Sequence, residues 1–298
     1  MAYPDDDAAR PGTAQGALWV VAAPLGNIDD LSPRARATLT PVNVILAEDT
    51  RSARRLLTEA GVATGGPTIL SCFDGNEHLR AEEAVRRIAA GEDFALLSEA
   101  GTPLVSDPGF RVVTAVIAAG LKVCPVPGPS AVLAALVGAG LPADRFTFLG
   151  FPPRKPGARK RLFQDLRSHP LTLVLYESPL RVAETLGDLA EVFGPDRAAC
   201  LARELTKPYE EFVRGTLGTL HARYRDERPL GEVTLVVGGA TADAEAPSDD
   251  ELQAEATRLL EAGLSARDAA DALAGRFGQP RRHVYAVVTQ VAALRKRP

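Results

Sequence analysis

The stretch that decides the fold reads FALLSEAGTPLVSDPGF and runs from Phe94 to Phe110. It opens with a short apolar run, typical of a buried parallel strand, that stops at Ser98 and Glu99. Glycines, prolines and hydroxyl side chains follow, up to a segment with helical spacing, Arg111 to Ala119. Ligands bind at the carboxyl ends of parallel strands, because loop amides and helix amino termini converge there. The stretch is therefore a candidate ligand loop, although for one such loop alone an ordinary strand-to-helix turn is the better interpretation.

The same order of apolar run, turn and helical segment repeats through the first half of the chain. The expected strands are Leu18–Ala23, Val42–Ala47, Thr68–Ser71, Phe94–Ser98 and Leu121–Val126. The expected helices are Ser32–Leu39, Arg51–Ala60, Glu77–Ala90 and Pro108–Ala119. Helices that alternate with strands force parallel pairing through right-handed crossovers. Residues 17–126 are therefore predicted to form a doubly wound α/β domain.

A run of prolines in PVPGPSA, Pro125 to Ala131, breaks this rhythm and marks a hinge. The expected strands beyond it are 145–151, 171–177, 198–204, 209–215 and 232–239. Only two clear helices separate them, Arg159–Arg167 and Leu180–Phe193. Some of these strands must then pair antiparallel, so residues 127–239 are predicted to form a second α/β domain with a mixed sheet.

The two ends of the chain have a different composition. Residues 1–16 are acidic and rich in proline and glycine, which predicts a disordered tail, and residues 240–250 have the composition of a linker. Residues 251–298 are predicted to form a small helical extension, with a capping-box start at Ser248 and Glu251. Its last helices, on either side of Gly278, fit a nucleic-acid-binding helix-turn-helix and a packed helical cap about equally well.

Composition excludes several classes of protein. The hydrophobic content of 46% and the charged content of 24% are typical of a folded chain, and a net charge of −4 gives no overall basic bias. The three cysteines and four histidines are scattered, so we expect neither disulfides nor a metal site. No apolar run reaches the ~20 residues of a membrane span. We expect a cytoplasmic protein with no membrane contact.

Three strand ends in the first half are predicted to share one edge of the sheet. They are APLGN at 23–27, AEDTR at 47–51 and SEAGTP at 98–103. Each alone has a structural explanation, since Asp49, for example, is a good helix cap. Together they favour a site. Because the chain lacks GxGxxG and GxxxxGK[ST], the expected ligand carries a nucleoside but no phosphates.

Eight motifs carry a resemblance to a known family. They are APLGNIDDLSPRA, LAEDTRSARRLL, LLSEAGTPLVSDPGF, VPGPSA, FLGFPPRK, YESPLR, ARELTKPYEE and GEVTLVVGG. In this order and spacing they resemble the tetrapyrrole methylase superfamily, and within it the bacterial branch that methylates a cytidine 2′-hydroxyl of small-subunit ribosomal RNA. The resemblance covers about Leu18 to Gly239. It departs at Glu99, where the family pattern has the shorter Asp.

The resemblance implies a homodimer of chains that each bind S-adenosylmethionine between two α/β domains. It also implies the residues that contact this cofactor, which are Ser98, Gly101, Thr102, Pro103, Asp107, Ser130, Ala131, Tyr176 and Ala202. Tyr176 equally fits a core position, since an aromatic residue that closes a strand usually packs inside. The PLGN sequence separates the chain from porphyrin-methylating relatives, which carry a GxGPGD-type loop there.

Methyl transfer to a hydroxyl depends mainly on alignment, and a base need only assist the hydroxyl. Glu48 and Asp49 are the candidates for that base or for orienting the ribose, and Arg51 for holding a phosphate. An internal ion pair among them is the competing interpretation. Asn27 and Lys207 are further candidates for contact with the substrate nucleotide.

A basic stretch at 154–167 is the candidate for binding 16S ribosomal RNA, within the small ribosomal subunit. Its RNA-binding candidates are Arg154, Lys155, Arg159, Lys160 and Arg161. They are expected on a mobile loop and helix that grip phosphates, although a run of charges is often only a solvated face. Two other functions stay open, a methyltransferase acting on a small tetrapyrrole and a non-enzymatic RNA-binding assembly factor.

Overall fold

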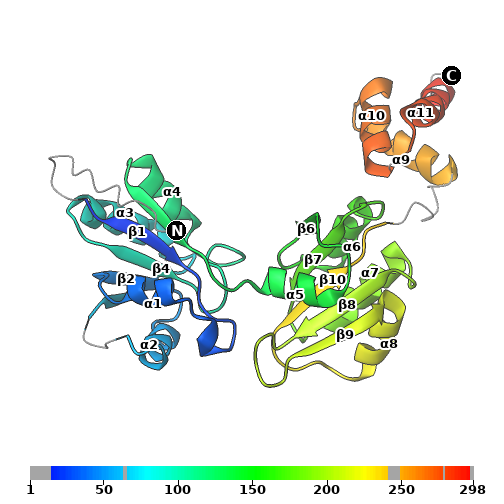
Figure 1. The fold of residues 1–298 in the computed structure, drawn as a ribbon. Coiled ribbons are helices and arrows are strands. Elements are labelled where there is room, and N and C mark those ends of the chain that lie inside the picture. Colours follow the sequence, from blue (N-terminus) through cyan, green and yellow to red (C-terminus); the bar gives the residue numbers. More distant parts are fainter. Residues whose placement is uncertain (1–14, 63–65, 241–248, 278, 296–298) are drawn as a thin grey trace. The chain divides into compact units, whose positions relative to one another are not determined.

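The computed structural model describes residues 15–62, 66–240, 249–277 and 279–295 (Figure 1). Its first elements are β1 (Ala17–Val21), η1 (Ile28–Asp30), α1 (Pro33–Leu39), β2 (Val44–Ala47), α2 (Thr50–Glu59), β3 (Thr68–Ser71), α3 (Glu77–Ala89), β4 (Phe94–Leu97), α4 (Phe110–Ala118), β5 (Lys122–Val126) and α5 (Ala131–Ala139). Then follow β6 (Phe146–Phe148), α6 (Pro156–Asp165), β7 (Thr172–Glu177), α7 (Val182–Phe193), β8 (Ala198–Arg203), β9 (Glu211–Thr216), α8 (Leu217–Asp226), β10 (Val233–Val237), α9 (Asp249–Glu261), α10 (Ala266–Phe277) and α11 (Arg281–Arg295).

The chain divides into two compact units. The first comprises the residues up to Ala134 together with Leu205–Pro208, and the second comprises Ala135–Glu204 and the residues from Tyr209 onward. Most of the predicted tail and linker lies outside the described residues. Gly16, however, already belongs to the first unit, because its N–H donates to the Ile88 carbonyl.

The first unit is the predicted doubly wound domain. Its sheet has the strand order β3-β2-β4-β1-β5, and every neighbouring pair is parallel. All four residues of β2 and of β4 are buried, as expected for central strands covered on both faces. Alternate residues of these strands pack against α1 and α2 on one face and against α3 and α4 on the other. The carboxyl ends of all five strands consequently lie at one edge.

The loop after β4 is fixed by a carboxylate from α3. Glu77 is 5% exposed, and its Oε1 accepts hydrogen bonds from the amides of Gly109 at 2.9 Å and Arg111 at 2.6 Å. These amides lie at the start of α4, where an acceptor satisfies groups that the helix leaves unpaired. Helix α4 begins at Phe110 and not at the predicted Pro108, because Gly109 leaves helical geometry with φ of 124°.

The second unit is built on the predicted mixed sheet, in the order β6-β7-β10-β8-β9. Strands β6 and β7 are parallel, and the other neighbouring pairs are antiparallel. Helices α6, α7 and α8 pack on one face of it (Figure 1). The prediction of only two helices between these strands was wrong. It missed α8, which begins at a capping box of Thr216 and Thr219 and has little amphipathic pattern.

Helices α9, α10 and α11 pack around their own small apolar core. Ser265 caps α10 as expected, since its Oγ accepts from the Asp268 amide at 3.1 Å. Arg281, at the start of α11, pairs with Asp271 of α10. The predicted Gly278 turn lies outside the described residues. Among the described helices, none combines the length and apolar character that a membrane crossing requires.

Replacing Glu77 tests how strongly the first unit depends on its carboxylate. Glu77→Leu keeps a similar volume but removes the acceptor from two amides, and an unsatisfied buried donor costs about 1–3 kcal/mol. Glu77→Gln keeps an oxygen and is the matched control. Trp19, the only tryptophan of the chain, lies on β1 and reports unfolding of this unit in urea by its fluorescence. Equal stability of the two variants would contradict the assignment.

Candidate active site

The loops after β1, β4 and β5 are tied together by hydrogen bonds. Ala23 and Gly101 exchange both backbone hydrogen bonds, at 2.8 and 3.0 Å. The Ser98 hydroxyl donates to the Gly101 carbonyl at 2.7 Å, and the Thr102 hydroxyl donates to the Pro129 carbonyl at 3.0 Å. Gly101 has φ of 72°, a left-handed conformation that suits glycine. The predicted ligand loop is therefore a rigid surface that joins three strand ends.

These contacts bear on the predicted cofactor residues. The hydroxyls of Ser98 and Thr102 donate within the protein, so they shape the surface and leave only their oxygen lone pairs to accept. Ser130 and Ala131 follow directly after the tied loop, at the amino terminus of α5. Tied loops with a helix amino terminus suit a polar nucleoside, so the residues present fit S-adenosylmethionine. Their contact with the cofactor stays a prediction.

Lys207 joins the first unit through the segment Leu205–Pro208. Its side chain packs on Gly26 of the PLGN loop so closely that a Cβ at Gly26 would lie 2.2 Å from Lys207 Cγ. Any larger residue at position 26 would displace the lysine. The neighbouring Asn27 caps η1, since its Oδ1 accepts from the Asp29 amide at 3.1 Å. Two predicted substrate contacts, Asn27 and Lys207, thus lie on adjoining segments.

The loops after β2, β3 and β4 line an open cavity of about 490 Å³. Its lining residues are Glu48, Phe73, Asp74, Ser106, Asp107 and Pro108. These strands are neighbours in the sheet, so the cavity lies at the same edge as the tied loops. The structure therefore brings Glu48 and Asp107 together, although the sequence assigned one to the substrate and the other to the cofactor.

Glu48 and Asp49 have different roles in the structure. Asp49 is the amino-terminal cap of α2, and its Oδ1 accepts from the amides of Arg51 at 2.6 Å and Ser52 at 3.2 Å. These hydrogen bonds lower the pKa of Asp49, which makes it a weaker base. Arg51 is exposed in the first turn of α2. Of the two carboxylates, Glu48 is the one that lines the cavity.

Asp107 has an unusual environment for a carboxylate. Burial, and to a lesser extent the nearby charges of Glu48 and Glu99, raise its pKa to about 6. The backbone beside it is strained, because Leu104 and Ser106 have φ of 72° and 70°. Left-handed conformations of residues other than glycine are costly and are enriched at functional sites.

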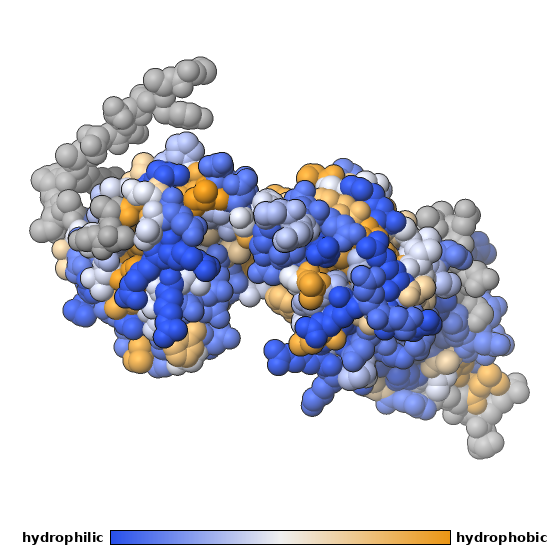
Figure 2. Space-filling model, turned by 90° about the horizontal axis from the view of Figure 1, so that it is seen from below, coloured by the Kyte–Doolittle hydropathy of each residue, from blue (hydrophilic) through white to orange (hydrophobic). Residues whose placement is uncertain are grey.

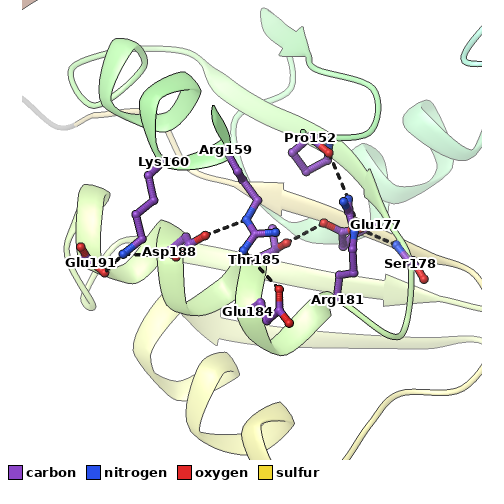
Figure 3. A network of polar contacts seen from close by, with 10 residues as sticks. All are labelled: Pro152, Arg159, Lys160, Glu177, Ser178, Arg181, Glu184, Thr185, Asp188 and Glu191. Carbon is purple, nitrogen blue, oxygen red and sulfur yellow. Dashed lines mark hydrogen bonds and ion pairs between the residues drawn. The ribbon is translucent and has the colours of Figure 1, made fainter. Parts of the chain in front are cut away.

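The predicted cofactor residues of the second unit lie in and beside its sheet. The Tyr176 ring packs against Phe148 and Phe151, with centroids 5.0 and 5.5 Å away. Ala202 is fully buried in β8, between β10 and β9, and its contact with a ligand stays a prediction. Next to Tyr176, the buried Glu177 binds Arg181, which in turn donates to the Pro152 carbonyl at 3.1 Å (Figure 3).

Two of the predicted RNA-binding residues form ion pairs within the second unit. Arg159 is 1% exposed, and its guanidinium pairs with Asp188 at 2.7 Å and Glu184 at 3.4 Å (Figure 3). Lys160 pairs with Glu191 at 2.6 Å and with Asp188 at 3.6 Å. The prediction that Arg159 grips phosphates was wrong, because this side chain is buried against the acidic face of α7. Lys160 is only half-buried and stays a weaker candidate.

Arg154, Lys155 and Arg161 are exposed at the start and on the outer side of α6. These three remain the candidates of the basic stretch for phosphate contact. On the face drawn in Figure 2, hydrophobic residues form small patches separated by hydrophilic ones.

Sequence reasoning missed Phe73, Asp74 and Glu77. Phe73 and Asp74 lie in the loop just after β3, and the parallel direction of that strand was a usable signal that they share the edge of the other strand-end loops. The pairing of Arg159 also had a signal, since Glu184, Asp188 and Glu191 recur at helical spacing on α7. Among the described residues, no group of three or more His, Cys, Asp or Glu side chains is arranged to hold a metal ion.

Comparison with known proteins identifies the family. Residues 17–221 match the model of the tetrapyrrole (corrin/porphyrin) methylases, which is more than half of the chain. The chain therefore belongs to the tetrapyrrole methylase family. This confirms the resemblance found in the eight motifs.

Within that family, the chain is similar to a particular group of proteins. It is 46% identical over 272 residues to the ribosomal RNA small subunit methyltransferase I of Xylella fastidiosa (strain Temecula1), covering 91% of this chain and 98% of that protein. It is 42% identical over 279 residues to the protein of the same name from a Synechocystis strain, covering 93% and 99%.

Solved structures of more distant proteins share the fold. One is the methyltransferase CobJ, which is 23% identical with a TM-score of 0.58, over 76% of this chain and 95% of that chain. Another is uroporphyrin-III C-methyltransferase from Thermus thermophilus complexed with S-adenyl homocysteine, which is 21% identical with a TM-score of 0.54, over 74% and 97%. At these identities the likeness shows the fold alone, and it confirms the predicted α/β architecture.

Substitutions on α6 and α7 distinguish charges that stabilise the fold through ion pairs from charges that are exposed and available to RNA. Asp188→Asn leaves the buried Arg159 short of a counter-charge and is expected to cost about 3–5 kcal/mol of unfolding free energy. Arg161→Ala, at an exposed position, is expected to change stability by less than about 0.5 kcal/mol. Urea unfolding followed by circular dichroism measures both. A stable Asp188→Asn variant would show that Arg159 does not depend on this pair.

Asp107 should give the stability of the first unit a specific pH dependence. Its pKa is raised on folding, so the stability that it contributes is complete below the unfolded pKa and is lost as the pH rises through about 6. The Asp107→Asn variant cannot ionise there. Relative to it, the wild type should therefore lose stability between about pH 4 and 6 and stay level above that. Urea unfolding followed by Trp19 fluorescence gives the unfolding free energy of both proteins at each pH. The same pH dependence in both would contradict the raised pKa of Asp107.

Proposed function

We propose that the protein transfers a methyl group from S-adenosylmethionine to the ribose 2′-hydroxyl of a cytidine in 16S ribosomal RNA. The coarser activity, a methyltransferase of small-subunit ribosomal RNA, rests on the 46% identity to a protein of that name over 91% of the chain. The ribose position and the base rest on the sequence motifs. The observation in the structure that supports them is a carboxylate-lined cavity beside the loops suited to the methyl donor.

S-adenosylmethionine supplies an activated methyl group on a sulfonium. The tied loops of Ser98, Gly101, Thr102 and Pro103 are the proposed contact for it, with Ser130 and Ala131 at the start of α5 beyond them. Tyr176 and Ala202 of the second unit are the further proposed contacts. Because the donor is already activated, the main task of these residues is to fix the orientation of acceptor and methyl group.

Glu48 is the proposed acceptor of the hydroxyl proton. It lines the cavity, whereas Asp49 is engaged as the cap of α2 and has a lowered pKa. Glu48 Oε is thus the carboxylate oxygen available to hydrogen-bond a ribose hydroxyl and to draw its proton away during transfer. Arg51, Asn27 and Lys207 are proposed to position the nucleotide, with the two cations near its phosphates.

The proposed partner is the small ribosomal subunit, reached in the cytoplasm by a homodimer of this chain. Exposed positive charge comes from Arg154, Lys155 and Arg161. Lys160 contributes less, because it is half-buried and paired with Glu191. The homodimer is supported by the family resemblance, and sedimentation velocity measures it directly.

Binding and product mapping test the function as a whole. Calorimetry should detect S-adenosylmethionine binding, and purified small subunits incubated with it should gain one ribose-methylated cytidine, located by mass spectrometry of nuclease fragments. Absence of cofactor binding would instead favour a non-enzymatic assembly factor. Methylation of a tetrapyrrole but not of small subunits would favour the small-molecule enzyme.

A substitution at Glu48 tests its role in proton transfer. Glu48→Gln keeps the shape but removes the basic oxygen, so we expect kcat to fall about 10²–10⁴-fold with little change in cofactor affinity. Asp49→Asn is the matched control, since asparagine caps a helix as well as aspartate does. Single-turnover methylation of small subunits gives the rate for each. Equal losses of kcat in the two variants would contradict the assignment of Glu48 as the base and Asp49 as only a helix cap.

A further inference from the structure

The cavity between the loops of β2, β3 and β4 has the dimensions of a ligand site. Its volume of about 490 Å³ falls within the roughly 300–1,000 Å³ of small-molecule sites. It lies at the β3-β2-β4 side of the sheet, whereas the tied loops of β1, β4 and β5 lie at the other side. The β4 loop serves both, since its start at Ser98–Thr102 is tied and its end at Ser106–Pro108 lines the cavity.

The lining of the cavity selects for a particular chemistry. None of its six lining side chains is basic, and Glu48, Asp74 and Asp107 are carboxylates. Phosphate is therefore disfavoured, and a group with N–H donors is favoured. Phe73 adds an aromatic ring that is 46% exposed and so offers an apolar face to a planar ligand.

Two features show that placing Asp107 at this position costs free energy. Desolvation and the charges of Glu48 and Glu99 disfavour its ionised form. The left-handed conformations of Leu104 and Ser106 precede it, and strain of this kind persists at ligand clamps where the surrounding structure imposes it. A ligand N–H that donates to Asp107 would relieve the unfavourable environment of its charge.

We propose that this cavity holds the base of the nucleotide to be methylated, with its ring stacked on Phe73 and its exocyclic amino group donating to Asp107. This inference rests on the proposed function. Cytosine carries an N4 amino group that carboxylates accept from, whereas uracil presents the O4 acceptor at that position. Unstacked bases of single-stranded RNA are recognised by aromatic stacking together with hydrogen bonds to their edges. Asp107, which the sequence assigned to the cofactor, is thereby reassigned to substrate specificity.

The test compares variants of the full-length protein on purified small subunits. Phe73→Ala should raise KM for the subunit about tenfold or more, because base stacking contributes strongly to binding. Phe73→Tyr should stay within about twofold, because tyrosine offers the same stacking face. Phe110→Ala is the matched control, since Phe110 is 71% exposed and does not line the cavity. Phe73→Leu, which retains the apolar volume without the ring, repeats the test if the alanine variant folds poorly.

Asp107→Asn tests the hydrogen bond to the base. Wild-type protein should methylate subunits with cytidine at the mapped position in strong preference to subunits with uridine there. In the variant the ratio of methylation at cytidine to methylation at uridine should fall at least about tenfold, because an amide can donate to uracil O4. Glu59→Gln, at an exposed position on α2, is the control for loss of one negative charge.

The outcomes separate this inference from the proposed function. If wild-type protein methylates a base atom or another nucleotide, the proposed function fails before any variant is compared. If wild type methylates the ribose but the Phe73 and Asp107 variants keep its KM and its base preference, the cavity is not the base site. If these variants instead weaken the calorimetric affinity for S-adenosylmethionine and leave KM for the subunit unchanged, the cavity holds the adenine of the cofactor and the inference is overturned.

Discussion

The structure of the first unit depends on how the chain leaves β4 and enters α4. Between them it must pass through left-handed conformations at Gly101, Leu104, Ser106 and Gly109. Such a path is unfavourable by itself and needs external support. Backbone hydrogen bonds to Ala23 fix its start, and the buried carboxylate of Glu77 fixes its end. Strands β1 and β4 and helices α3 and α4 are thereby joined at one edge of the sheet.

This single loop divides the edge into two regions with different chemistry. Its beginning is tied by the hydroxyls of Ser98 and Thr102 and is rich in backbone polar groups. Its end contributes Ser106 and Asp107 to a cavity with acidic lining. Because one rigid segment forms both regions, their separation is fixed by the fold. Methyl transfer demands such fixed alignment of donor and acceptor, which is the main source of rate when the donor is already activated.

The sequence was sufficient to predict the two sheets and the edge at which the loops after the parallel strands gather, because both follow from periodicity and strand direction. It was insufficient where one side chain has to be assigned between a local and a functional contact. Asp49 proved to be a helix cap, and the hydroxyls of Ser98 and Thr102 bind carbonyls of the loops themselves. Arg159 was misassigned because its acidic partners lie on another helix. The basic run that contains Arg159 does not by itself indicate that such partners exist. Local pattern determines the fold class, and long-range pairing determines which charges reach the solvent.

An acidic cavity is at first sight an unexpected feature of a protein that acts on RNA. Its carboxylates repel the phosphate backbone, so they act against non-specific occupation by the chain that the protein must bind. The exposed cations Arg154, Lys155 and Arg161 belong to α6 and its amino-terminal flank in the other unit and do not line this cavity. In the proposed binding mode these three cations attract the RNA backbone beyond the target nucleotide, whereas the cavity selects the base. A nucleotide enters such a cavity only by presenting its base, and the energy of unstacking that base is offset by Phe73 and the carboxylates together. In the proposed binding mode the same carboxylates thus repel the phosphate of the nucleotide and attract the amino group of its base.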